Sequence, residues 1–350
     1  MRVLVTGSSG LIGSEAVAFF DSLGFDVLGV DNNMRRDFFG PKGDTTPNLA
    51  RLVASCKRFK HSPLDIRDRE GVERLFRNEP IDLVIHAAAQ PSHDLAASRV
   101  YDDFAVNALG TLNLLESCRL HRPEAVFIQV STNKVYGDAP NALPMHELET
   151  RFDYADAALE QGIDESLTID QSTHSLFGVS KASGDLLAQE YGRYFGLKTG
   201  VFRGGCLTGP QHAGVELHGF LNYLVATALD ERPYTIFGYK GKQVRDQIHC
   251  HDVVSAFWVF AQKPRAGEVY NLGGGKANAA SLIECIELIA DRTGKGPVTT
   301  YNPTNRVGDH ICYYTNMAKF RKHFPAWKQE YSLDRIVDEM IDRVRVAKAA

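Results

Sequence analysis

Three glycines near the start of the chain are spaced to bind a phosphate group. They stand in the stretch Gly7-Ser-Ser-Gly10-Leu-Ile-Gly13, between an apolar run and a segment with helical spacing. Glycine lets the backbone approach a pyrophosphate, and the first turn of the following helix offers N–H groups and positive potential. Asp31 ends the next apolar run, where a carboxylate can accept the ribose hydroxyls of NAD and repel the extra phosphate of NADP. NAD is therefore the predicted cofactor, with contacts from Gly7, Gly10, Leu11, Ile12, Gly13, Asp31 and Asn32.

Two arginines just beyond Asp31 leave one alternative for the cofactor. Arg35 and Arg36 carry the charge that a 2′-phosphate needs, so they keep NADP open.

A second set of residues that could take part in chemistry lies in residues 171–184, QSTHSLFGVSKASG. Lys181 follows Phe177 by one helical turn, so the two side chains share a face of the predicted helix. Phenylalanine cannot transfer a proton. His174 can, because imidazole titrates near neutral pH, and the same argument holds for His93. The stretch predicts the entrance of a catalytic helix, with His174 as a candidate proton acceptor.

The elements that would position these groups alternate along the first 205 residues. Short apolar runs, RVLVTG, FDVLGVD, IDLVIHAA, AVFIQVST and KTGVFRGG, predict buried strands, and TLNLLESCRLH and KASGDLLAQEYGRYFG predict helices. This alternation indicates βαβ units and a parallel sheet that is covered on both faces. We therefore expect an α/β fold with a Rossmann-type doubly wound domain over 1–205, to which a segment near 241–262 returns. A smaller α/β domain, mainly 206–350, would bind the substrate in a cleft against the first.

Residues 138–172 form a long, acidic segment without clear periodicity. Loops of that length in compact proteins are uncommon unless they have a function. Its position just before Phe177 makes it a candidate substrate lid, with a solvated surface insertion as the alternative.

Composition narrows the possible partners. The net charge of −4 gives no reason to expect nucleic acid or an anionic membrane surface. Six cysteines are widely spread without a CxxC pair, and the neighbours His249, Cys250 and His251 would point to opposite faces of a strand, so no metal site is predicted. No signal peptide or membrane span is expected, which places the protein in the cytoplasm.

These motifs together resemble the extended short-chain dehydrogenase/reductase family, the nucleotide-sugar epimerases and dehydratases. The further matching words are Asp65-Ile66, His86-Ala-Ala-Ala89 and Ser131-Thr-Asn-Lys-Val-Tyr-Gly137. The resemblance implies that Asp65 and Ile66 hold the adenine, and that Ala87, Ala88 and Ala89 line the nicotinamide. It implies that Thr132 binds the reacting sugar oxygen, and that Lys181 holds the nicotinamide ribose and adds positive charge. It also implies a homodimer through the helices near 101–120 and 181–195.

Within that family the chain is similar to the CDP-paratose 2-epimerase subfamily. The words that carry this likeness are STNKVYGD, ETRF followed by GIDES, and GKQVRD. The likeness implies NAD-dependent epimerisation of a nucleotide-diphosphate sugar at C2, with a CDP-sugar favoured. The residues expected to bind the substrate are Asn133, Lys134, Arg203, Arg245, Arg306 and Asp309, the arginines because a guanidinium pairs bidentately with phosphate oxygens.

The resemblance also exposes a departure, because the family places a proton-transferring tyrosine where this chain has Phe177. Either His174, His93, Tyr136, Tyr154 or Cys206 transfers the proton, or the phenylalanine is an inactivating substitution, or the protein binds NAD and nucleotide sugars without catalysis. Dehydration is the other enzymatic alternative. The 4,6-dehydratases carry an Asp-Glu pair where this chain has Asn133 and Lys134, which cannot supply a carboxylic acid.

Overall fold

The computed structural model describes residues 1–211, 219–305 and 308–349. They form two compact units, each assembled from three stretches of chain. The first unit comprises Met1–Val135, Ser175–Gly204 and Val253–Tyr270, and the second comprises Tyr136–His174, Gly205–Asp252 and Asn271–Ala350.

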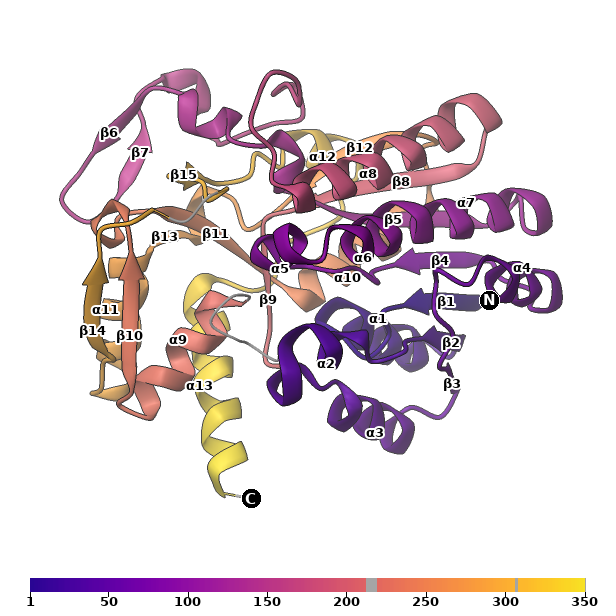
Figure 1. Ribbon diagram of the computed structural model, residues 1–350, viewed down its shortest axis with the longest axis horizontal. Coiled ribbons are helices and arrows are strands. Elements are labelled where there is room, and N and C mark those ends of the chain that lie inside the picture. Colours follow the sequence, from indigo (N-terminus) through magenta and orange to yellow (C-terminus); the bar gives the residue numbers. More distant parts are fainter. Residues whose placement is uncertain (212–218, 306–307, 350) are drawn as a thin grey trace. The chain divides into compact units, whose positions relative to one another are not determined.

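A seven-stranded sheet forms the centre of the first unit, with strand order β12-β8-β5-β4-β1-β2-β3. Five of its strands are the predicted apolar runs, and Figure 1 shows them stacked in this order. All pairings from β8 to β3 are parallel. The strands are β1 (Arg2–Thr6), β2 (Asp26–Val30), β3 (Phe59–Ser62), β4 (Leu83–His86), β5 (Val126–Thr132), β8 (Lys198–Gly204) and β12 (Glu268–Leu272). The predicted α/β class with a doubly wound sheet is confirmed.

Helices cover both faces of this sheet. Neighbouring residues of a strand point to opposite faces, and β8 illustrates the result. Val201 joins the apolar cluster formed with α4, α7 and α8, whereas the ring of Phe202 packs on Phe257 and Phe260 of α10. The helices are α1 (Leu11–Ser22), α2 (Met34–Phe39), α3 (Thr46–Ser55), α4 (Arg69–Asn78), α5 (His93–Ser98), α6 (Val100–Phe104), α7 (Gly110–His121), α8 (Leu176–Phe195) and α10 (Cys250–Gln262).

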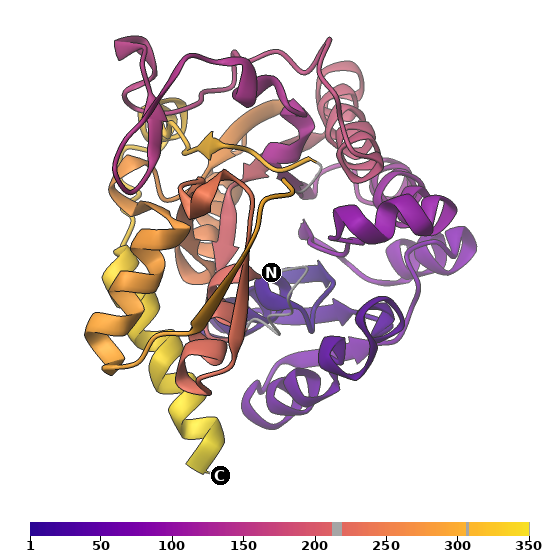
Figure 2. The same ribbon diagram turned by 60° about the vertical axis from the view of Figure 1, so that its left-hand side comes forward.

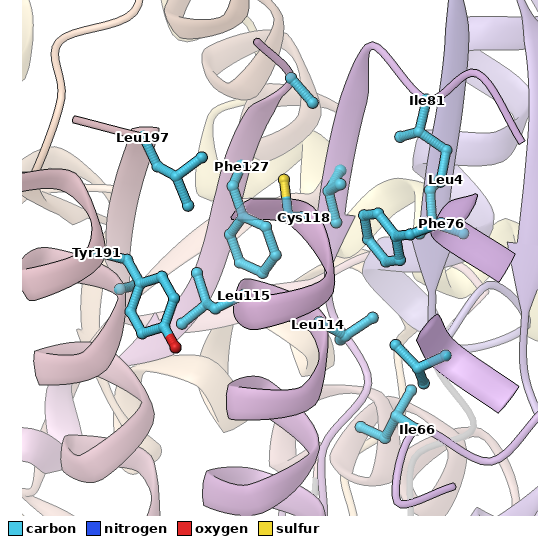
Figure 3. Close-up of a cluster of buried hydrophobic side chains, with 14 of the residues drawn as sticks. Leu4, Ile66, Phe76, Ile81, Leu114, Leu115, Cys118, Phe127, Tyr191 and Leu197 are labelled. Carbon is cyan, nitrogen blue, oxygen red and sulfur yellow. The ribbon is translucent and has the colours of Figure 1, made fainter. Parts of the chain in front are cut away.

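The cluster on the first face is drawn in Figure 3. Leu4 and Phe127 of the sheet are fully buried there with Phe76 of α4 and Leu115 of α7. Burying a side chain of this size contributes about 1.5–3 kcal/mol. This packing holds α7 and α8 against the sheet, and α8 carries Phe177 and Lys181 of the candidate site.

The second unit contains several smaller sheets. Its strands are β6 (Met145–Glu147), β7 (Phe152–Tyr154), β9 (Cys206–Thr208), β10 (Pro233–Phe237), β11 (Val244–His249), β13 (Ala279–Ser281), β14 (Val298–Asn302) and β15 (Cys312–Tyr313). Strand β11 pairs with β9, β13 and β15 rather than with the large sheet. The predicted returning segment, 241–262, is therefore divided between the units, with α10 rather than β11 in the first.

Helices α9 (Phe220–Leu229), α11 (Leu282–Thr293) and α13 (Leu333–Ala349) of the second unit share an apolar cluster. The second unit also contains α12 (Ala318–His323). Leu224 of α9, Ile289 of α11 and Ile336 of α13 are fully buried together. Figures 1 and 2 show α13, in yellow, running beside α9.

Short helical turns complete the chain. They are η1 (Gly40–Gly43), η2 (Ala105–Leu109, a π-helical turn), η3 (Asn133–Tyr136), η4 (Ala139–Ala142), η5 (Ala157–Leu159), η6 (Tyr239–Gly241) and η7 (Lys276–Asn278). Across the described residues, no helix is long and apolar enough to cross a membrane.

The segment 138–172 has fixed contacts within the second unit. Its β6–β7 hairpin is antiparallel. Arg151 pairs with Glu284, whose backbone N–H and carboxylate complete the capping box of α11, and the hydroxyl of Tyr154 donates to the carbonyl of Cys312 at 2.8 Å. These bonds anchor the segment within the second unit, and both the substrate lid and the surface insertion remain predictions.

Candidate functional site

The glycine turn forms a cradle at the start of α1. Gly7 has a φ of 67°, and a Cβ built on it would lie 2.8 Å from the backbone nitrogen of Ala88. A Cβ on Gly13 would lie 2.0 Å from the carbonyl oxygen of Gly7. The N-cap residue Gly10 offers no side-chain hydrogen bond to the first turn, and that turn holds no acidic residue. Its N–H groups therefore suit an anion such as a pyrophosphate.

Polar atoms around this cradle also fit a dinucleotide. The Asp31 carboxylate accepts the backbone N–H of Ser9 at 2.9 Å and of Asn33 at 2.8 Å, which fixes its orientation. The hydroxyls of Ser8 and Ser9 are buried and find no hydrogen-bond partner among the described residues. Unpaired buried hydroxyls carry an energetic penalty that a bound phosphate or ribose would remove. Ser9 was not among the predicted cofactor contacts, although its position between Gly7 and Gly10 could have indicated one.

Asp65 and Ile66 lie beyond β3, but the Asp65 carboxylate is already engaged. It accepts from the Arg67 guanidinium at 2.8 Å and from Asn32 Nδ2 at 3.0 Å. Burial by itself raises the pKa of Asp65, but the hydrogen bonds and charge of Arg67 outweigh burial and hold this pKa below its usual value. A bound adenine would therefore contact a carboxylate that already binds Arg67. Nothing in the sequence indicated a role for Arg67.

The turn after β4 lies against the glycine turn. Ala88 donates its N–H to Thr6 Oγ1 at 3.3 Å, and the loop that includes Ala87 and Ala89 follows His86. His86 Nδ1 lies 2.7 Å from Thr6 Oγ1, and burial lowers the pKa of this histidine to about 3. His86 is thus a neutral structural residue and no candidate base.

Thr132 and its neighbours occupy the carboxyl end of β5, where ligands of parallel sheets bind. Thr132 Oγ1 donates to Asn133 Oδ1 at 3.4 Å and accepts the N–H of Lys134 at 3.2 Å. Asn133 is buried and Lys134 is half-buried. The roles predicted for these three residues remain predictions.

Lys181 and Phe177 lie one turn apart in α8 and are both buried. Lys181 Nζ donates to the carbonyl of Val130 at 2.7 Å, which holds the ammonium against β5, two residues before Thr132 in the strand. Burial lowers the pKa of Lys181 to about 8, and the charges of Asp185 and Asp103 oppose that shift.

A buried polar network supports this part of α8. Asn107, in the π-helical turn, donates to Ser180 Oγ at 3.0 Å and to Asp103 Oδ1 at 3.1 Å. Gln90 Nε2 donates to the same Asp103 oxygen at 2.8 Å. Isolated π turns are frequent at functional sites. No motif in the sequence pointed to Asp103.

The candidate bases differ in their surroundings. His93 Nδ1 lies 2.7 Å from Ser175 Oγ, and its ring contacts Phe177. His174 belongs to the other unit, where its Nδ1 lies 3.0 Å from the carbonyl oxygen of Ser172. Tyr136 and Tyr154 are buried with their hydroxyls bonded, to Asn271 Oδ1 and to the Cys312 carbonyl. Burial raises the pKa of Tyr154 far above its usual value, so its hydroxyl stays protonated at neutral pH and cannot act as a base.

Arg203 is buried in the first unit. Its Nε and Nη2 each donate at 3.0 Å to the carboxylate of Asp185, which also accepts from Ser131 Oγ at 2.6 Å. The pair thus holds the end of β5 against α8. Asp185 was not predicted, because it lies far from Arg203 in the sequence.

In the second unit, Arg245 Nη2 lies 3.4 Å from Asp309 Oδ1, and its Nη1 donates to its neighbour's carbonyl at 2.7 Å. The structure therefore brings together two of the residues predicted to bind the substrate. Arg306 lies outside the described residues. Across the described part of the chain, no group of three or more His, Cys, Asp or Glu residues could hold a metal ion.

Comparison with known proteins agrees with this geometry. Residues 3–273 match the NAD dependent epimerase/dehydratase family. A CDP-paratose 2-epimerase from Salmonella typhi is 34% identical over 350 residues, which cover 98% of this chain and 98% of that protein. A dTDP-glucose 4,6-dehydratase from Escherichia coli is 29% identical over 83% of this chain and 76% of its own length.

Solved structures share the whole fold. The complex of a Thermus thermophilus UDP-glucose 4-epimerase with NAD superposes with a TM-score of 0.76 at 26% identity, covering 99% of this chain and 100% of that one. The predicted family resemblance is confirmed, both by the matched profile and by a full-length relative above 30% identity. The chain therefore belongs to the NAD dependent epimerase/dehydratase family.

Proposed function

We propose that this protein is an NAD-dependent epimerase of a nucleotide-diphosphate sugar, acting at C2 through a transient ketone. The observation that carries the proposal is the first unit's combination of a phosphate cradle, Asp31, Thr132 and Lys181 in a chain that aligns end to end with a CDP-paratose 2-epimerase. A pure cofactor-binding protein would need neither Thr132 nor arginines that bind a substrate diphosphate. A CDP-sugar is the favoured substrate, since that relative's name specifies one.

Each residue of the candidate site has its own role in the proposed reaction. NAD, when bound by the glycine turn and Asp31, supplies reversible hydride transfer at the sugar carbon. Thr132 donates a hydrogen bond to the oxygen that becomes the ketone, and Lys181 holds the nicotinamide ribose and stabilises developing negative charge. Arg245 and Arg306 bind the diphosphate, and Asn133, Lys134, Arg203 and Asp309 complete the proposed substrate contacts.

The proposed function is tested by incubating the NAD-loaded protein in heavy water with CDP-, UDP-, GDP- and dTDP-sugars, followed by proton NMR and nicotinamide absorbance. A new sugar isomer without solvent deuterium is expected, because the hydride that leaves the sugar returns to it. Deuterium uptake would indicate a proton-exchange mechanism, and a lasting rise in absorbance would indicate net oxidation. Either result would contradict the proposal.

Dehydration is the second candidate, because several relatives are dTDP-glucose 4,6-dehydratases. In that case the same incubation would yield a keto-deoxy sugar. The end of β5 carries an amide at 133 and an ammonium at 134 in place of a carboxylic acid, which argues for epimerisation.

Replacing Asp31 by alanine is expected to weaken NAD binding by about 10–100-fold, the loss of one or two hydrogen bonds to a charged group. NADP should not lose affinity in the same way, because the lost repulsion of the 2′-phosphate offsets the lost ribose contact, and the preference for NAD should vanish. Isothermal titration with both cofactors measures this. Equal affinities for the two cofactors in the wild type would contradict the role of Asp31.

Turnover is expected to fall as pH rises through about 8, because Lys181 then loses its charge. The pKa is lowered, so the charged form persists only below that value. A profile of kcat from pH 6 to 10 measures this fall. The variant Lys181→Met should have a low kcat that does not fall between pH 8 and 10. A wild-type rate that stays flat to pH 10 would show that the charge of Lys181 plays no part.

We also propose a cytoplasmic homodimer, with all six cysteines free as in a reducing compartment. Helices α6, α7 and α8 and the turn η2, which contact one another, expose apolar side chains, and Tyr101 and Tyr194 are 92% and 79% exposed. Patches of this kind mark interfaces. The other members are Val100, Phe104, Leu109, Leu120, Leu176, Val179, Leu186 and Phe195.

A double replacement, Tyr101→Glu with Tyr194→Glu, is expected to convert the dimer to a monomer, as measured by light scattering. Tyr301→Glu, an exposed tyrosine in β14 of the other unit, is the matched control. A double variant that stays dimeric would place the interface elsewhere.

A further inference from the structure

The ring of His93 lies against the residue that replaces the family's tyrosine. His93 begins α5, and Ser92 caps that helix by accepting the N–H of Leu95. The ring centroid of His93 is 4.9 Å from that of Phe177, in an edge-on contact with an interplanar angle of 62°. The histidine therefore stands beside position 177, within the same unit as Thr132 and Lys181.

Ser175 fixes the orientation of this ring. Its Oγ accepts the N–H of Gly178 at 3.1 Å as the N-cap of α8, and it lies 2.7 Å from His93 Nδ1. Because the N–H of Gly178 fixes the Ser175 hydroxyl in place, this hydroxyl is a rigid hydrogen-bond partner for the His93 ring. If Nδ1 carries the ring proton and donates it to this hydroxyl, the basic lone pair is on Nε2. A base oriented by a third group is the arrangement found in many catalytic sites.

Other titratable groups of the chain are less suited to accept a proton. His86 has both ring nitrogens engaged, by Thr6 and Thr111, in the buried core. Lys181 donates to the Val130 carbonyl and carries the charge on which its own role depends. Tyr136 and Tyr154 are buried with bonded hydroxyls.

We propose that His93 accepts and returns the proton that a tyrosine at position 177 would otherwise transfer, and that Ser175 is its positioning residue. The assignment rests on the proposed function. In the first half-reaction the C–H and O–H bonds of one sugar carbinol would break and a C=O bond would form. NAD bound at the glycine turn would supply the hydride acceptor, and Nε2 of His93 would take the proton. In the second half the imidazolium returns its proton to oxygen while the hydride returns to the opposite face of the carbon. The sugar and the cofactor thus end in their original oxidation states.

One arm of the test does not require turnover. In NAD-loaded protein labelled with ¹⁵N-histidine, the signals of His93 are identified by their loss in His93→Gln, and long-range ¹H–¹⁵N spectra report both protonation and tautomer. We expect the neutral ring of His93 to be the Nδ1–H tautomer. In Ser175→Ala the fixed tautomer should give way to a mixture. A fixed Nε2–H tautomer in the wild type would overturn the assignment.

The second arm compares turnover in His93→Gln, Phe177→Tyr and the double variant. His93→Gln should lower kcat by about 10²–10⁴-fold while the sugar and NAD dissociation constants hold. Adding Phe177→Tyr to His93→Gln should recover at least about tenfold, since the phenol hydroxyl can move the proton instead. His146→Gln, an exposed histidine in β6, is the neutral control.

Two results in this arm would overturn the assignment. One is a His93→Gln variant with wild-type kcat, and the other is a larger loss of kcat in His174→Gln than in His93→Gln. A wild type that binds the sugars but converts none of them overturns the proposed function instead. The tautomer of His93 then tests its orientation by Ser175 independently of turnover.

Discussion

Arg203→Met is expected to lower the free energy of unfolding by about 3–5 kcal/mol, because it leaves a buried carboxylate without its cation. The side chains of Arg203 and Asp185 are 7% and 1% exposed, and two hydrogen bonds of 3.0 Å join them. Asp185 also accepts from Ser131 and Gln189, so the loss would disturb the end of β5 where Thr132 stands. Urea unfolding followed by circular dichroism measures the effect.

The double variant Arg203→Met with Asp185→Leu is the control. Removing both charges leaves no unpaired ion, so most of the stability should return even though the pair is gone. The alternative is the substrate contact predicted from the sequence. An Arg203→Met protein with wild-type stability but weaker nucleotide-sugar binding would favour that role over the structural one.

Thr132→Val is expected to lower kcat by about 10²–10³-fold, the usual effect of removing one hydrogen-bond donor from a developing oxyanion. Valine has nearly the shape of threonine, so the fall in kcat measures the contribution of the hydroxyl and not a change in packing. The Thr132 hydroxyl also accepts the N–H of Lys134 at 3.2 Å, which holds the turn after β5. Steady-state kinetics with the sugar identified by NMR measures the change.

Thr132→Ser is the matched variant, because it keeps the hydroxyl and loses only a methyl group. It should retain most of the wild-type kcat, whereas Thr132→Val should not. If both variants kept wild-type kcat while only KM rose, Thr132 would bind the sugar uniformly and would not act on the reacting oxygen.

The first unit could be predicted well because its signals are local. Buried parallel strands are continuous apolar runs, and LVIH and VFIQVST are nearly fully buried in β4 and β5. The glycine turn is a steric requirement, shown by the 2.0 Å that would separate a Cβ on Gly13 from the Gly7 carbonyl oxygen. Such features need no knowledge of distant partners.

What could not be predicted depends on contacts between distant residues. Strand β3, FKHS, lies at the edge of the sheet and is only half-buried, so it lacks the apolar run that identified its neighbours. The contact of His93 with Ser175 joins residues 82 positions apart, and the sequence favoured His174 over His93 as the proton acceptor. The acidic segment 138–172 looked unstructured because hydrogen bonds from Arg151 and Tyr154, rather than apolar periodicity, hold it.

The interleaving of the two units along the chain has a consequence for folding kinetics. Each unit combines three stretches of sequence, and the edge strand β12 (Glu268–Leu272) joins β8 (Lys198–Gly204) only after much of the second unit has been synthesised. Contacts of high sequence separation slow folding, and an unpaired edge of β8 can pair with other chains meanwhile. A nascent chain that ends before residue 268 therefore presents an open sheet edge, and this protein should depend on chaperones during synthesis more than a protein whose units are contiguous in sequence.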